Sequence, residues 1–149
     1  MALRYQHTQV GWWIFALAGP LMLVATVLAL RDAFAGGVIV AVLAMVILLS
    51  LFSLTTAVSE NDVRVWFGIG LISRRIALNQ ITSARTVTTH WIYGWGIRWI
   101  PGGWLWNVSG LDGVELALVN GRRFRIGTDE PERLAAAIQE MIRNERGSR

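Results

Sequence analysis

The side chains best suited to chemistry in this chain are few, and their spacing matches no recognised catalytic motif. Ser109, His90 and Asp112 are the residue types of an acyl-transfer triad, but no nucleophile-elbow motif surrounds the serine. His7 and His90 are the two histidines, they have no metal-ligand spacing, and the chain contains no cysteine. The sequence therefore predicts a protein that is not an enzyme and that binds no metal and no cofactor.

The basic residues exclude further reactions and indicate an anionic partner. All 14 are arginine, and without lysine the chain can form neither a Walker phosphate loop nor a Schiff base. The glycine pairs 68/70 and 94/96 lack the third glycine of a dinucleotide site. A net charge of +4 suits either nucleic acid or an anionic lipid surface.

Arginine clusters are the candidate anion sites, because guanidinium groups bind phosphate in a bidentate manner. We expect most of them to face solvent or to pair across strands, as Arg125 would with Glu115. A site for an anionic lipid headgroup is the second interpretation. It would use Arg74, Arg75, Arg98, Arg122 and Arg123.

The segment from His90 to Asn107 is unusually aromatic. In an extended chain, the rings at odd positions from 91 to 99 would lie on one face. A tight turn at residues 101–103 would set Trp99 opposite Trp104 or Trp106. These rings either fill the core or form a surface for the headgroup layer or a partner protein. The residues are Trp91, Tyr93, Trp95, Trp99, Trp104 and Trp106.

Two long apolar runs in the first third of the chain must determine where the rest of the chain lies. Val10 to Leu30 and Ala33 to Leu54 contain no charged residue or histidine, and only Arg31 and Asp32 separate them. About twenty helical residues cover the roughly 30 Å core of a bilayer. The sequence therefore predicts a transmembrane hairpin, with spans at about 10–30 and 33–54, within an N-terminal part of residues 1–54.

Details of these runs fit a hairpin in lipid. Small residues recur every four positions, which favours close helix packing. They are Ala25 and Ala29 in the first run and Ala33, Gly37 and Ala41 in the second. Trp12 and Trp13 lie where indoles prefer the headgroup layer. The positive-inside rule favours both termini in the cytoplasm.

From residue 55 to residue 149 the pattern changes to alternating strands. A turn at Asn61 and Asp62 would pair Val58 with Val65 and Leu54 with Ile69. Two further strands are expected at about 71–78 and 81–89, in a set of about seven.

For the last pair of strands the sequence also predicts the register. Apolar residues at even positions on both sides of Asn120 and Gly121 require a loop of odd length, with Gly121 left-handed. That loop pairs Leu116 with Phe124 and sets Glu115 opposite Arg125. A helix at about 130–144 follows, with Asp129 at its N-cap. Its buried face would hold Leu134, Ile138, Met141 and Ile142.

Several motifs in this part resemble those of the bacterial pleckstrin-homology-like membrane proteins. They are Gly70, the stretch Ser73-Arg74-Arg75-Ile76-Ala77-Leu78-Asn79-Gln80-Ile81, Gly94-Trp95-Gly96-Ile97-Arg98, Gly113-Val114-Glu115-Leu116 and the stretch from Ile126 to Leu134. Relatives often have proline where this chain has Ala77. The resemblance implies an α+β protein, with the two-helix transmembrane hairpin followed by a split β-barrel and a C-terminal capping helix.

It also implies a location in the bacterial inner membrane, as a multi-pass protein, and a function without catalysis. We expect a membrane-anchored domain that acts in protein–protein interaction or self-assembly at the cytoplasmic face. The alternative is an accessory or assembly subunit of a larger membrane complex, and a less favoured one is an anionic-lipid-binding module. The expected partners are the lipid bilayer and either a second copy or another membrane protein, with no nucleic acid.

Overall fold

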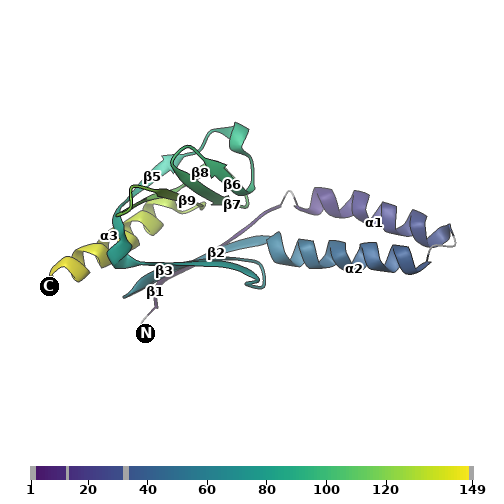
Figure 1. Ribbon diagram of the computed structural model, residues 1–149, viewed down its shortest axis with the longest axis horizontal. Coiled ribbons are helices and arrows are strands. Elements are labelled where there is room, and N and C mark those ends of the chain that lie inside the picture. Colours follow the sequence, from purple (N-terminus) through teal and green to yellow (C-terminus); the bar gives the residue numbers. More distant parts are fainter. Residues whose placement is uncertain (1–2, 13, 32–33, 148–149) are drawn as a thin grey trace.

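The computed structural model describes residues 3–12, 14–31 and 34–147 as an α+β structure, with a β-domain and a long helical hairpin (Figure 1). The strands are β1 (Leu3–Val10), β2 (Ser53–Ser59), β3 (Asp62–Phe67), β4 (Ile72–Ala77), β5 (Ile81–Thr88), β6 (Gly96–Ile100), β7 (Gly103–Asn107), β8 (Asp112–Leu118) and β9 (Arg123–Gly127). The helices are α1 (Ile14–Leu30), α2 (Phe34–Leu51) and α3 (Pro131–Gly147), with short 3₁₀ turns η1 (Leu78–Gln80) and η2 (Trp91–Tyr93).

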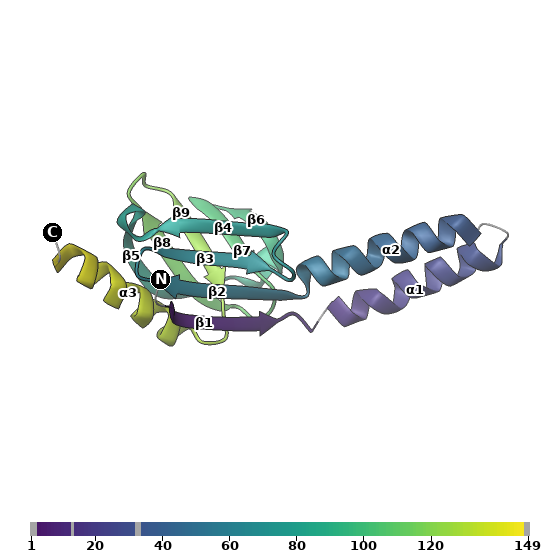
Figure 2. The ribbon, with the colours of Figure 1, turned by 90° about the horizontal axis from the view of Figure 1, so that it is seen from below.

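The strands form two sheets that enclose the core. One has the order β1-β2-β3-β4 and the other the order β5-β8-β9-β7-β6. Figure 2 shows the first sheet in front of the second, with the hairpin projecting from one end of the domain. Phe67 from the first sheet and Phe124 from the second are fully buried, and both contact the ring of Trp106.

The first sheet follows the predicted alternation with two differences. The β2–β3 pair brings Val58 opposite Val63 and Leu54 opposite Phe67, so the predicted pairing was wrong by two residues. The apolar side chains still share one face, because a shift of two keeps the parity. The second difference is β1, which pairs with β2 and which the sequence did not predict.

The predicted β-hairpin of β8 and β9 in the second sheet is confirmed. Leu116 lies opposite Phe124 and Glu115 opposite Arg125, and Gly121 in the turn has a φ of +76°. The C-terminal helix is also confirmed. In α3, Leu134, Ile138, Met141 and Ile142 are buried, and this face covers β5 and β8.

The two apolar helices pack through small residues, as expected. A Cβ on Gly37 would lie 2.8 Å from the carbonyl oxygen of Ala25 and 3.0 Å from the Cβ of Ala29, which leaves no room for a larger side chain. Ala33 lies outside the described residues. The close approach fixes how α1 and α2 lie against each other.

The prediction of a transmembrane hairpin was wrong. Within residues 3–12, 14–31 and 34–147, no helix is both long enough and apolar enough to cross a membrane. Val10 belongs to β1 and Ser53 begins β2, so the apolar runs contribute helices of only 17 and 18 residues. Such helices are about 26 and 27 Å long, against the roughly 30 Å of a bilayer core. The predicted placement as a multi-pass protein of the bacterial inner membrane is overturned by the same finding.

Candidate interaction surface

The hairpin of α1 and α2 has an apolar outer surface. No acidic or basic residue lies within either helix, and large apolar side chains are exposed along both. Several of them are more than half exposed: Met22, Leu23, Leu30, Ile39, Val42, Leu43, Met45 and Ile47. Thr26 is polar, but its hydroxyl donates to the carbonyl of Met22 in the same helix at 2.8 Å. The hairpin therefore offers a partner apolar surface and no charge.

The loops at the hairpin end of the β-domain carry further exposed apolar side chains, which we call the rim. The members and their exposed fractions are Trp12 (75%), Ile69 (63%), Leu71 (67%), Trp91 (71%), Ile92 (67%) and Leu111 (43%). They come from four separate segments of the chain.

Backbone contacts bring these segments to one end of the domain. The amide of Gly68 donates to the carbonyl of Ser53, next to the end of α2, and so places the turn that carries Ile69 and Leu71. The hydroxyl of Ser109 donates to the carbonyl of Val10 at 3.2 Å, which places the β7–β8 loop beside the start of the hairpin. The amide of Thr89 donates to the carbonyl of Leu111 in that loop, just before η2 with Trp91 and Ile92. The rim and the hairpin are thus neighbouring surfaces.

Gly68 makes the joint between the hairpin and the β-domain. It has a φ of +44°, and a Cβ at this position would overlap the carbonyl oxygens of Leu49 and Ser50 at the end of α2. The β3–β4 turn therefore lies directly against the last turn of α2. The absence of a side chain at residue 68 permits this approach.

The aromatic segment divides between core and surface. Trp106 is 7% exposed and packs in the core, whereas Trp91, Trp95, Trp99 and Trp104 are exposed. Trp99 lies opposite Trp104 in the β6–β7 pair, with the two rings edge to face at 5.1 Å. The predicted single extended face was wrong, because residues 91–93 form the turn η2 with Tyr93 half-buried. Trp13 lies outside the described residues.

The five arginines of the predicted anion site have different partners in the structure. The Arg74 guanidinium lies 4.6 Å from the centre of the Phe124 ring, and burial followed by the nearby Arg122 lowers its pKa below the usual value. Arg75 pairs with Asp62. Arg98 donates through Nε to the carbonyl of Trp95 at 3.2 Å.

Arg123 belongs instead to a cluster around a buried carboxylate. Glu115 is 2% exposed and accepts hydrogen bonds from Arg85 and Arg125, while Arg123 Nη1 lies 3.8 Å away. Burial opposes ionisation of Glu115, but the hydrogen bonds from Arg125 and Arg85 outweigh it and hold the pKa of the carboxyl below its usual value. One carboxylate thus gathers three arginine side chains in the second sheet, and the cluster keeps an excess of positive charge.

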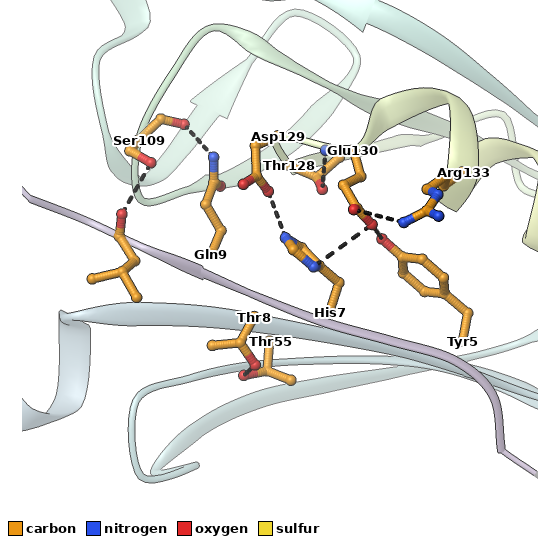
Figure 3. Close-up of polar contacts among 11 residues, drawn as sticks. Tyr5, His7, Thr8, Gln9, Thr55, Ser109, Thr128, Asp129, Glu130 and Arg133 are labelled. Carbon is orange, nitrogen blue, oxygen red and sulfur yellow. Dashed lines mark hydrogen bonds and ion pairs between the residues drawn. The ribbon is translucent and has the colours of Figure 1, made fainter.

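A polar strap, defined here by Tyr5, His7 and Gln9 of β1, ties the strand before the hairpin to the rest of the domain (Figure 3). His7 Nε2 lies 2.6 Å from Asp129 Oδ1, the Tyr5 hydroxyl donates to Glu130 at 3.3 Å, and Gln9 donates to the carbonyl of Ser109 at 3.1 Å. Asp129, expected as the helix N-cap, contacts β1, while α3 begins two residues later at Pro131. No local pattern predicts this contact, since His7 and Asp129 are 122 residues apart in the chain.

The three side chains of the hypothetical triad each have another partner. His90 Nδ1 accepts from the amide of Ile92, Ser109 Oγ donates to Val10, and Asp112 accepts from Thr88 at 2.9 Å. Among the residues that the structure describes, no group of three or more metal-ligand side chains comes together. Comparison of the chain with protein-family models and with curated protein sequences finds no match.

Proposed function

We propose that this chain is an assembly protein without catalytic activity, and that it associates with further copies of itself through the hairpin and the rim. The observation that carries the proposal is the outer surface of α1 and α2, which is uncharged and, over the described residues, exposes large apolar side chains on both helices. A helix of this kind is normally buried all round. Each large apolar side chain taken out of water contributes about 1.5–3 kcal/mol.

The chemistry of the surface favours a second copy as the partner. The described parts of α1 and α2 carry no charge, and the hydroxyl of Thr26 is satisfied within its own helix. Nothing polar is available to select a partner of different chemistry, whereas a like hairpin offers the same apolar surface. Two-helix hairpins that pack together form helical bundles, which bury surfaces that one hairpin leaves exposed.

The rim extends this surface onto the β-domain. Trp91 and Ile92 lie at the end from which the hairpin projects, and aromatic residues are enriched at protein interfaces. A copy packed along the hairpin would reach the rim as well. The resemblance to pleckstrin-homology-like proteins implies the same class of function. The accessory-subunit alternative would use this surface for a different protein.

The experiment is the protein mass of the full chain in neutral detergent, measured by sedimentation equilibrium over a range of dilutions. We expect an oligomer that dissociates on dilution, and we expect the double variant Ile39→Gln/Leu43→Gln to be a monomer. Val119→Gln is the matched control, because Val119 is 71% exposed but lies in the β8–β9 turn, away from the hairpin. A monomeric wild type would overturn the proposal. Monomers that float with neutral lipid vesicles would also overturn it, and would assign the apolar surface to lipid.

A further inference from the structure

We propose that a groove over β3 and β4 binds the phosphate group of a small phosphate monoester. The groove has a volume of about 490 Å³ and is lined by Arg64, Val65, Trp66, Gly70, Ser73, Arg74 and Arg75. Three of these seven residues are arginines, and two of them, Arg64 and Arg75, have exposed side chains. The inference does not rest on the proposed self-assembly, since the side chains that carry it belong neither to the hairpin nor to the rim.

Two of the arginines are held side by side by one buried carboxylate. Arg64 and Arg75 lie directly opposite each other in the β3–β4 pair, an arrangement that is unfavourable for like charges. Asp62, 4% exposed, bridges them, with its two oxygens 3.4 Å from Arg64 Nε and 2.5 Å from Arg75 Nε. Both contacts use Nε. Each guanidinium also has two terminal nitrogens, which can donate to a phosphate.

The groove carries excess positive charge. In the described residues, Asp62 is the only carboxylate paired with Arg64 or Arg75, and Arg74 has no ion pair at all. Its guanidinium instead lies over the buried Phe124 ring, on the core side of the sheet, where Arg74 is paired with buried Val65. Arg64 and Arg75 thus share one carboxylate and present an excess of positive charge to the groove. An anion such as a phosphate monoester would balance that charge.

The remaining lining suits a ligand that is larger than inorganic phosphate. Ser73 is exposed, and its hydroxyl can donate to a phosphate oxygen. Trp66 is half-buried opposite Ser73 in the β3–β4 pair, and its indole offers a flat apolar wall. We therefore expect a phosphate ester with a planar group to bind more tightly than phosphate alone.

The test is calorimetric titration of the full chain, in neutral detergent, with inorganic phosphate and with phenyl phosphate. We expect both to bind, phenyl phosphate more tightly. Arg75→Gln should weaken phenyl phosphate binding about tenfold, as expected for a lost charge-assisted hydrogen bond. Because that variant also removes a partner of buried Asp62, Ser73→Glu provides a second variant at an exposed position. It should abolish binding of both ligands.

Ser83→Glu is the matched control, because Ser83 is also exposed on a strand but lies on β5 in the other sheet. It should bind as the wild type does. Equal binding by Ser73→Glu and Ser83→Glu would overturn the proposal, and so would the absence of heat with both ligands.

Titration with dihexanoyl phosphatidic acid below its micellar concentration distinguishes a lipid headgroup from a soluble ester as the source of the phosphate. Tighter binding than phenyl phosphate would assign the site to a lipid headgroup, and weaker binding to a soluble ester.

Discussion

Glu115 and Arg125 face each other across the β8–β9 pair, and the guanidinium donates from Nε to Glu115 Oε2 at 2.7 Å. Arg85 reaches the other carboxylate oxygen from β5, with Nε at 3.1 Å. One buried carboxylate thus connects three neighbouring strands, β5, β8 and β9. The contact across β8 and β9 was predictable, whereas Arg85 enters through a strand pairing that is distant in sequence.

Glu115→Gln should destabilise the domain by about 1–3 kcal/mol at neutral pH, since it removes charge-assisted hydrogen bonds to arginines that remain partly hydrated. The pKa of Glu115 is lowered in the folded state, so the unfolded chain binds the proton first. The stabilisation is therefore complete above about pH 5 and is lost as the pH falls through the folded-state pKa. Urea unfolding of the wild type and of Glu115→Gln should show a difference in the free energy of unfolding that decreases at acidic pH. A difference that does not change with pH would contradict the lowered pKa of Glu115 in the folded state.

Gly68→Ala should loosen the joint between the hairpin and the β-domain. Gly68 and Gly121 both have a positive φ, but only a Cβ on Gly68 would overlap backbone atoms, and Gly121 has open space. Gly121→Ala should cost about 1–2 kcal/mol from the backbone conformation alone. Gly68→Ala should cost more in the same unfolding measurement. Equal losses would show that the contact with α2 is unimportant.

The two classes of tryptophan should differ in their contribution to stability. Trp106→Ala removes a ring that packs between Phe67 and Phe124, and we expect a loss of about 3–5 kcal/mol. Trp99 is 62% exposed, so Trp99→Ala should cost less than about 1 kcal/mol. Thermal unfolding measures both. Similar losses would contradict the division of the aromatic segment into core and surface.

The Tyr5 hydroxyl should ionise at a higher pH than an unperturbed tyrosine. Burial, together with the negative charge of Glu130 and the hydrogen bond to it, raises the pKa of Tyr5 to about 12. The chain has two tyrosines, so in Tyr93→Phe the absorbance change near 295 nm reports Tyr5 alone. Glu130→Gln in that background should lower the midpoint. Because the folded-state pKa is raised, this group stabilises the fold below about pH 10, and the stabilisation is lost as the pH rises towards 12. A midpoint near 10 in Tyr93→Phe would place Tyr5 outside the strap.

How far the sequence predicts this fold depends on whether the signal is local. The β8–β9 register follows from the parity of Leu116 and Phe124 and from Gly121, so it could be predicted. The β2–β3 turn was placed one residue late, which shifts the pairing by two, because Ser59, Glu60, Asn61 and Asp62 are all compatible with a turn. The structure settles this by burying Asp62, whose carboxylate accepts from Ser59 Oγ at 2.6 Å.

The largest errors concern contacts between distant segments. In β1, Tyr5, His7 and Gln9 show no apolar alternation, and only pairing with β2 and the polar strap identify the strand. The length of the apolar runs favoured membrane spans, but their ends at Val10 and Ser53 belong to strands. The rim joins four loops, which no local pattern brings together.

The central claim is that copies of this chain associate along the hairpin, and cross-linking tests it most directly. The natural sequence has no cysteine, so a single introduced one reports its own surroundings. Val42→Cys places a thiol on the outer surface of α2, where Val42 is 56% exposed, and Ser83→Cys is the control on the exposed face of β5. Under mild oxidation of the full chain in detergent, the account predicts covalent dimers of Val42→Cys and monomers of Ser83→Cys. Monomers of Val42→Cys, or equal dimer yields from both variants, would contradict it.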